Sequence, residues 1–161
     1  MKLITQELQI YKMLSLNLPD YPVKITMKND KKVIFDIVRK AYVALTPEEW
    51  VRQHFIHFLI EKKGYPQGLL ANEVQLNLNG MKKRCDSVLF DKTLRPRLTI
   101  EYKAPTVEIT QKVFTQISNY NLVMKVDYLI VSNGLLHYCC KIDYNEQSYH
   151  FLEEIPDYSL L

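Results

Sequence analysis

Two acids and a lysine on neighbouring predicted strands are the residues of this sequence best suited to chemistry. Asp86 lies in the segment 83–91, and Glu101 and Lys103 lie in the next segment, 98–104. Side chains alternate between the two faces of a strand, so Glu101 and Lys103 point the same way, about 7 Å apart. If the two strands pair, Asp86 and Glu101 can meet.

Two carboxylates beside an ammonium group are typical of a site for a hard divalent cation. Mg²⁺ prefers oxygen ligands and is usually held by one or two carboxylates together with substrate phosphates. A lysine beside it can orient a water or stabilise charge on a phosphate under attack. The spacing therefore indicates metal-assisted phosphodiester hydrolysis. Acids and lysines are also common on solvated strand faces, and the two segments taken alone favour that simpler interpretation.

Length and composition indicate one soluble domain, residues 1–161, without a linker or repeat. The chain has 47% apolar and 24% charged residues and a formal charge of +3, too small to indicate nucleic-acid binding by itself. Basic clusters near the predicted site can contact phosphates or simply form solvated turns: Lys62–Lys63, Lys82–Arg84, Arg95 and Arg97. Three cysteines, two of them adjacent, and the lack of a signal peptide or an apolar span predict a cytoplasmic protein.

A predicted helix precedes the acid-bearing strands. Thr46 is a suitable N-cap, Pro47 suits the first helical position, and Gly64 should end the helix after Lys63. Glu48 lies at the N-terminal end of the apolar stripe, and Glu49 lies roughly 100° away around the helix. Either acid can support the site, with Glu48 ranked first, or both can simply complement the helix dipole.

The other predicted elements form a mixed sheet flanked by helices. Short strands are expected within 1–22, and a hairpin is expected over 23–27 and 32–38. A strand over 69–79 turns at Asn79–Gly80 into the Asp86 strand, which should carry Arg84, Asp86, Val88 and Phe90 on one face. A helix over 107–125 carries Gln116 and Tyr120 and leads to a strand over 126–132, parallel to the Glu101 strand. Strands over 135–143 and 148–152 close the sheet.

The order of these motifs resembles the PD-(D/E)XK nuclease superfamily and, more closely, the N-terminal nuclease domain of type I restriction enzyme R subunits. The resemblance covers roughly residues 45 to 158 and rests on five segments: Pro47–Gln53, Lys83–Val88, Glu101–Pro105, Gln116 with Tyr120, and Tyr128–Gly134. It implies a restriction-endonuclease-like α/β (α+β) fold. Residues 46–158 would form the core and 1–45 a β-rich extension.

The resemblance also implies roles for individual residues. Asp86 and Glu101 would ligate Mg²⁺, and Lys103 would position or activate the attacking water. Glu48, or in second place Glu49, would be the supporting acid, while Gln116 and Tyr120 match the glutamine-tyrosine motif that accompanies the catalytic residues. The implied partners are DNA and the specificity and methyltransferase subunits of a restriction system, or a separate helicase.

Two departures from the family pattern limit what the resemblance implies. Type I R subunits contain helicase domains, but this sequence has no G-x-x-x-x-G-K-[ST] loop for ATP. We therefore expect a stand-alone relative or a fragment, without translocation. Cys85 stands where a small apolar residue is expected, a conservative change. A non-catalytic module that binds nucleic acid or a partner on the same fold is the alternative. Zinc or cysteine chemistry at His54, His57 or Cys139–Cys140 has little support.

Overall fold

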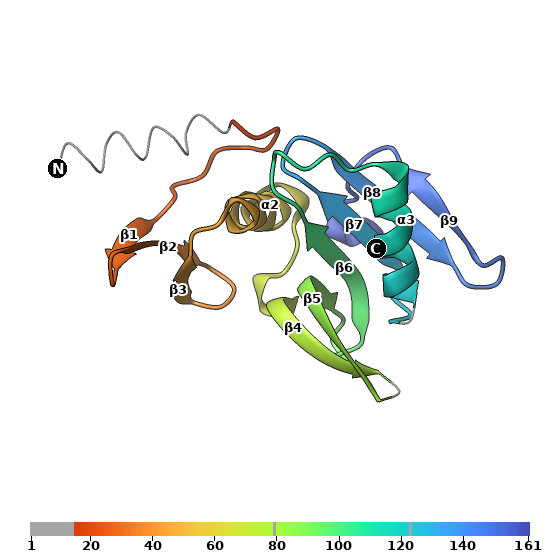
Figure 1. Cartoon of the computed structure of the whole chain (residues 1–161). Coiled ribbons are helices and arrows are strands. Elements are labelled where there is room, and N and C mark those ends of the chain that lie inside the picture. Colours follow the sequence, from red (N-terminus) through yellow and green to blue (C-terminus); the bar gives the residue numbers. More distant parts are fainter. Residues whose placement is uncertain (1–14, 79, 123) are drawn as a thin grey trace.

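A six-stranded mixed sheet forms the centre of the computed structural model, which describes residues 15–78, 80–122 and 124–161. Its strand order is β4-β5-β6-β7-β8-β9, so each strand lies beside the one that follows it in the chain (Figure 1). All neighbours are antiparallel except β6 and β7. The strands are β4 (Leu70–Leu78), β5 (Met81–Phe90), β6 (Pro96–Tyr102), β7 (Tyr128–Ser132), β8 (His137–Asp143) and β9 (Ser148–Leu152).

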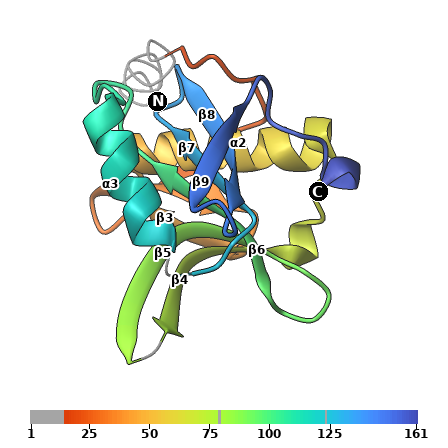
Figure 2. The ribbon, with the colours of Figure 1, turned by 90° about the vertical axis from the view of Figure 1, so that its right-hand side faces the viewer.

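Two helices cover opposite faces of this sheet (Figures 1 and 2). Helix α2 (Pro47–Lys63) packs on one face through an apolar cluster that includes Phe55, Leu59 and Ile100. Helix α3 (Gln111–Leu122) packs on the other face through Phe114, which belongs to a second cluster with Leu129. The predicted α+β class, a mixed sheet flanked by helices, is confirmed.

The ends of α2 lie where the sequence predicts them. The Thr46 side chain accepts a hydrogen bond from Glu49 N at 3.1 Å, and Gly64 adopts the left-handed conformation with φ of 72°. Such a cap satisfies backbone donors that the first turn of a helix leaves unpaired. The helix is therefore fixed at both ends, and its first turn is held close to the sheet.

Helix α3 also forms the predicted crossover, because it connects β6 to the parallel strand β7. It is shorter than the predicted 107–125. The reason lies at Thr110, whose hydroxyl accepts a hydrogen bond from Val113 N and whose carbonyl accepts one from Phe114 N. Thr110 therefore acts as the N-cap, and the residues before it form a loop.

A separate three-stranded sheet precedes α2, in the order β1 (Ile25–Lys28), β2 (Lys31–Asp36) and β3 (Ala41–Ala44). The sequence predicts the β1–β2 hairpin but not β3. The short strands expected within 1–22 are absent from residues 15–22, and residues 1–14 lie outside the described part. Two 3₁₀ turns, Gln67–Leu69 and Tyr158–Leu160, complete the described elements.

The segment before the small sheet contacts the turn between β7 and β8. Asn17 N donates a hydrogen bond of 2.8 Å to Gly134 O. Gly134 has a φ of +84°, and a Cβ atom there would lie 2.7 Å from the Leu16 side chain. Only glycine fits this backbone conformation and this close approach without strain. No described helix is long and apolar enough to cross a membrane.

Candidate active site

In the hairpin of β4 and β5, the regular alternation of side chains between the two faces of the sheet is broken at one position. The pairs Asn72↔Ser87 and Val74↔Cys85 are in register, but Glu73 and Asp86 between them form no ladder pair. Glu73 has a φ of +55°, which is costly for any residue with a side chain. Asn72 and Ser87 lie on the side of the sheet that faces α2 and are joined by a hydrogen bond. The neighbouring pair, Val74 and Cys85, packs on the opposite side, in the apolar cluster that contains Phe114 of α3.

This reversal corrects the alternation predicted for β5. Cys85 and Val88 pack in the same apolar cluster, although strict alternation puts them on opposite faces. Ser87 instead hydrogen-bonds Tyr102 Oη on the α2 side. Cys85 does pack as a small buried residue, 0% exposed. The irregularity at Glu73 and Asp86 turns both acids out of the regular strand pattern and towards a cleft.

Asp86 lies where β5 separates from β6. The last ladder pair between these strands is Ser87↔Ile100. One residue beyond it, Asp86 Oδ2 accepts a hydrogen bond of 2.8 Å from Tyr102 N. The carboxylate thus takes the place of a backbone carbonyl as acceptor, and this hydrogen bond fixes its orientation. The Asp86 side chain is nevertheless 28% exposed. Asp86 is fixed, yet open to the cleft.

Glu101 lies next to Asp86 and is poorly satisfied. Burial and the neighbouring Asp86 charge raise the pKa of Glu101 to about 8, although Lys83 and Lys103 oppose the shift. Its Oε1 atom is buried and has no hydrogen-bond partner among the described residues. A buried carboxylate oxygen without a donor is uncommon and needs an explanation. The structure therefore brings Asp86, Glu101 and Lys103 together, as the sequence predicts.

The three residues open into a cleft of about 500 Å³. It lies between the first turn of α2, the end of β3 and the point where β5 and β6 diverge, and thirteen described residues line it: Arg39, Val43, Ala44, Thr46, Glu48, Glu49, Arg52, Glu73, Arg84, Asp86, Glu101, Tyr102 and Lys103. Nine of these are acidic or basic residues. Such a cleft suits a charged ligand rather than an apolar one.

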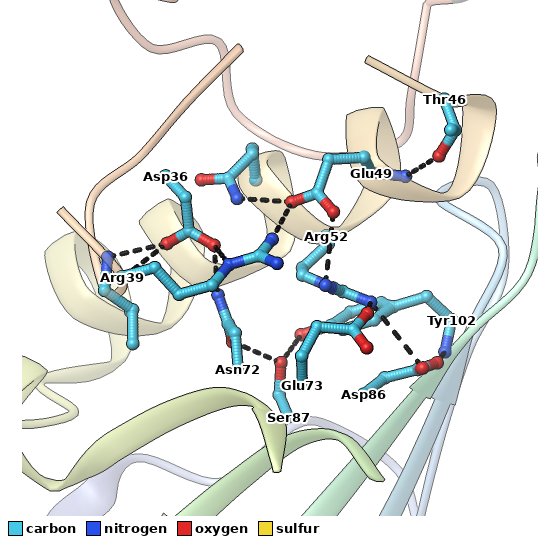
Figure 3. A network of polar contacts seen from close by, with 12 residues as sticks. Asp36, Arg39, Thr46, Glu49, Arg52, Asn72, Glu73, Asp86, Ser87 and Tyr102 are labelled. Carbon is cyan, nitrogen blue, oxygen red and sulfur yellow. Dashed lines mark hydrogen bonds and ion pairs between the residues drawn. The ribbon is translucent and has the colours of Figure 1, made fainter. Parts of the chain in front are cut away.

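Arg52 of α2 lies among three of the acids (Figure 3). It bonds Glu49 at 3.1 Å and Glu73 at 2.6 Å, and lies 3.6 Å from Asp86. The side chain is only 4% exposed. Burial alone would lower the pKa of Arg52, but the surrounding acids raise it above its ordinary value. Arg52 is therefore a permanent cation that holds the acids of α2 and of the hairpin together.

A second network connects the small sheet to the cleft. Arg39 donates to Glu49 Oε1 at 2.8 Å and also contacts Asp36. Asp36 in turn accepts a hydrogen bond from Asn72 at 2.9 Å, and Asn72 accepts one from Ser87 at 2.6 Å. The chain of contacts thus runs from β2 to β5 (Figure 3). Residues before 46 therefore take part in building the cleft.

Two other predicted residues, Glu48 and Gln116, are placed differently from the central group. Glu48 is exposed at the cleft rim, whereas Glu49 is 7% exposed and carries the contacts to Arg39, Arg52 and Gln53. The geometry thus favours Glu49, ranked second from sequence, as the helix acid. Gln116 is exposed on α3 and does not line the cleft. Tyr120 lies in α3, but its side chain is outside the described part.

Sequence reasoning missed several charged residues of the site. Arg52 carried a signal, because a basic residue within a helical apolar stripe and three positions after Glu49 must find a buried partner. Lys83 is also buried, bonded to Asn121 at 2.9 Å, and burial lowers the pKa of Lys83. Glu73 carried no signal, because a reversal in the middle of a strand has no local sequence code. Arg39 depends on an unpredicted packing of the small sheet.

The oxygen atoms of the site fit a divalent cation. Asp86 and Glu101 provide two neighbouring carboxylates, and Glu101 Oε1 is the buried oxygen that lacks a hydrogen bond among the described residues. Hard cations such as Mg²⁺ select such ligands and keep several waters. A cation would also remove the repulsion that raises the pKa of Glu101. The donor set, rather than any bound ion, supports this assignment.

An α+β domain with a charged cleft at the end of a mixed sheet is the class that fold and site define. The family model of the type I restriction enzyme R protein N terminus matches residues 47–156, more than half of the 161 residues. The chain belongs to this family. The predicted resemblance to type I R subunits is thus confirmed. No curated protein matches the chain.

A solved structure shares the fold. It is the fragment structure described as an HsdR subunit of a type I restriction enzyme from Vibrio vulnificus YJ016, with a TM-score of 0.50 and 18% sequence identity. The match covers 70% of this chain and 24% of that one. At this identity the likeness shows the fold alone. Because this chain spans about a quarter of that one, activities of a whole R subunit are not transferred to it.

Proposed function

We propose that this domain is a Mg²⁺-dependent DNA endonuclease of the PD-(D/E)XK type, related to the nuclease domain of type I restriction R subunits. One observation carries the proposal: Asp86 and Glu101 lie together beside Lys103, and Glu101 keeps a buried oxygen without a donor. The family membership supports a restriction-system context. DNA is the proposed substrate.

Each residue of the cleft has a distinct part in this proposal. Asp86 and Glu101 would hold Mg²⁺, which when bound supplies charge stabilisation at the phosphate. The Tyr102 amide keeps Asp86 oriented through its 2.8 Å hydrogen bond. Lys103, next to Glu101, orients the attacking water and stabilises negative charge that develops on the phosphate. Glu49, through Arg52, positions the acids of the hairpin rather than touching the substrate.

Arg84, an exposed arginine in the lining of the cleft, would help to guide DNA into it. Arg84 has a side chain that is 70% exposed although it contacts Glu73. Lysine and arginine at such positions neutralise phosphates and make binding depend on salt. In a restriction system, specificity and methyltransferase subunits or a separate helicase would deliver the DNA. These partners are part of the proposal.

Cleavage of supercoiled plasmid DNA tests the proposal. Purified protein is incubated with Mg²⁺, Mn²⁺ or EDTA, beside Asp86→Ala and Lys103→Ala. Matched controls are Glu153→Ala and Lys112→Ala, which remove an exposed acid and an exposed lysine outside the cleft. We expect metal-dependent nicking that falls by at least about 100-fold in both cleft variants and persists in both controls.

Two outcomes count against parts of this proposal. One is equal cleavage by the wild type and Lys103→Ala, which would remove the proposed role of the lysine. The other is a folded wild type that binds DNA in EDTA but never cleaves it in Mg²⁺ or Mn²⁺. That result would favour the alternative function, a non-catalytic DNA-binding module on this fold.

A further inference from the structure

The small sheet β1–β3 carries the whole excess of positive charge of the protein. Residues 23–45 contain six basic and two acidic residues, a formal +4, whereas the entire chain has a formal +3. One of the two acids, Asp36, is 0% exposed and contacts Arg39. The remainder of the chain is therefore slightly acidic, and a polyanion would be attracted to this sheet.

The two faces of the small sheet differ sharply. Ile34 and Asp36 are both 0% exposed and point towards the body of the domain. Strand register places the residues that alternate with them on the outer face, including the paired Phe35 and Tyr42 and the paired Lys28 and Lys31. Lys24 lies on this face as well, with Nζ 5.5 Å from the centre of the Phe35 ring.

The lysines of the outer face lack acidic partners. Lys28 and Lys31 are directly opposite each other across the hairpin, an arrangement that destabilises a sheet. Within the described ranges neither forms an ion pair, and Lys24 forms only its ring contact. This repulsion is relieved when an anion from outside the chain binds between the lysines.

Two aromatic rings lie among these lysines. Phe35 and Tyr42 pack edge to face, with ring centres 5.3 Å apart, and the Tyr42 side chain is 44% exposed. Proteins that bind single-stranded nucleic acid combine exposed rings, on which bases stack, with basic groups that follow the backbone. A duplex offers phosphates but hides its base faces. The exposed ring therefore favours an unpaired strand.

The outer face is continuous with the candidate active site. Tyr42 lies on the edge strand β3, and the next two residues, Val43 and Ala44, line the cleft. The sheet is held in place by the Asp36–Asn72 hydrogen bond and by Gln67, which donates to Ile37 O at 2.9 Å. A strand that crosses β3 can therefore pass directly from the outer face into the cleft.

We propose that the outer face of β1–β3 binds an unpaired nucleic-acid strand and leads it to the cleft, with phosphates at Lys28 and Lys31 and a base on Tyr42. The inference deepens the proposed function and rests on it only for the role of the cleft. It narrows the substrate to DNA with a single-stranded segment. Residues 23–45 lie outside the segment matched by the family model, residues 47–156.

Fluorescence anisotropy with a labelled oligo-dT of about 20 nucleotides, long enough for one or two sites of this kind, tests the inference. Binding is measured in EDTA, where cleavage plays no part, for the wild type, Lys28→Glu/Lys31→Glu and Tyr42→Ala. Lys92→Glu/Lys112→Glu is the matched control, because it changes the charge equally at exposed positions outside the small sheet. Circular dichroism verifies the folding of each variant.

We expect Tyr42→Ala to weaken oligo-dT binding about tenfold, as loss of one stacked base should. The Lys28/Lys31 double variant should bind more weakly still, with a slope of log affinity against log salt that is smaller by about 1.4. The control should keep both affinity and slope. A duplex of the same length should compete less well than oligo-dT.

Equal weakening in the sheet variant and its matched control would overturn the inference, since it would show only a general effect of charge. Unchanged oligo-dT affinity in Tyr42→Ala would also overturn the inference, as would a duplex that binds as tightly as oligo-dT. Asp86→Ala should still bind oligo-dT. If binding behaves as expected while plasmid cleavage fails, the proposed catalytic function is wrong and the binding surface stands.

Discussion

Two acids near the cleft, the buried Asp36 and the half-buried Glu101, have opposite surroundings. Asp36 accepts hydrogen bonds from Val38 N, Arg39 N and Asn72 Nδ2, and also contacts the Arg39 side chain. Glu101 keeps a buried oxygen without a donor in the described part of the chain. The carboxylate of Asp36 thus has hydrogen-bond donors for its oxygen atoms, whereas that of Glu101 has an oxygen atom without a donor among the described residues.

The pKa values follow this difference. Burial would raise the pKa of Asp36, but its hydrogen bonds and the charge of Arg39 lower it below the ordinary value. Burial and the charge of Asp86 raise the pKa of Glu101. Ionisable groups whose pKa is strongly shifted by burial and by a neighbouring charge are enriched at functional sites. The comparison teaches that the hydrogen bonds of Asp36 are satisfied within the protein, whereas Glu101 keeps an oxygen without a donor among the described residues, as the proposed metal site requires.

The largest expected contrast between the two acids is in catalysis. Glu101→Gln keeps the shape of the side chain but removes a proposed metal ligand, so metal-dependent plasmid nicking should fall by at least about 100-fold. Asp36→Asn should keep the rate per folded molecule, measured at a temperature where the variant is folded. Similar losses in both variants would contradict the division into a structural and a functional acid.

The next effect is on stability, and it should be large only at Asp36. Asp36→Ala removes one of the two acids that Arg39 contacts and the acceptor of the Asn72 amide group, and breaking a buried, hydrogen-bonded charge pair costs about 3 kcal/mol. Urea unfolding at pH 7 measures this loss. Because the pKa of Asp36 is lowered in the folded state, the loss should shrink as the pH falls through that pKa. A loss that stays constant at acidic pH would show that packing, not charge, is responsible.

Substitution of Glu101 should have a smaller effect on stability than substitution of Asp36, and it should stabilise the protein rather than destabilise it. Its pKa is raised from 4.5 to about 8 in the folded protein, so between these pH values the folded state binds more protons than the unfolded state. Stability should therefore decrease as the pH rises through this window. In EDTA at pH 8, Glu101→Gln should raise Tm, by roughly 2–4 °C for each kcal/mol of unfavourable ionisation that it removes.

Thermal unfolding of Glu101→Gln and wild type at pH 5 and pH 8 checks this prediction. The two proteins should differ less at pH 5, where the wild-type carboxyl is largely protonated. A variant that is less stable than the wild type at pH 8 would mean that the Glu101 charge is well accommodated without a metal.

The smallest effect is expected at the rim of the cleft. Glu48→Gln should leave plasmid nicking and Tm within error of the wild type, because Glu48 is exposed. Glu49→Gln, the matched variant one residue away, should lower both, since Glu49 holds Arg39 and Arg52. A larger loss in Glu48→Gln than in Glu49→Gln would instead support Glu48 as the helix acid, the residue ranked first from sequence.

The sequence predicts the frame of the molecule better than the contacts of its cleft. The cap at Thr46, the stop at Gly64 and the crossover into β7 have local signals, and all three are confirmed. The meeting of Asp86 and Glu101 follows from the pairing of adjacent strands, whose register places the two residues opposite each other. These features depend on residues close together in the chain, which is why patterns reveal them.

Other features depend on packing between distant segments. The positive φ of Glu73 reverses the hairpin and defeats the alternation predicted for β5. Strand β3 is short and lacks a turn signal, and Arg39 reaches Glu49 only because the small sheet packs beside α2. The choice of Glu49 over Glu48 also follows from that contact. No periodicity within one segment encodes a partner that lies in another.

The central claim is that Asp86 and Glu101 form a divalent cation site. Mn²⁺ titration by calorimetry at pH 7.5 tests it most directly, because this pH lies just below the raised pKa of Glu101, about 8, and metal binding should therefore release protons. The account predicts one Mn²⁺ per wild-type chain with proton release, loss of binding in Glu101→Gln, and retained binding in Asp36→Asn. Binding of equal strength in wild type and Glu101→Gln, or no binding by the folded wild type, would contradict it.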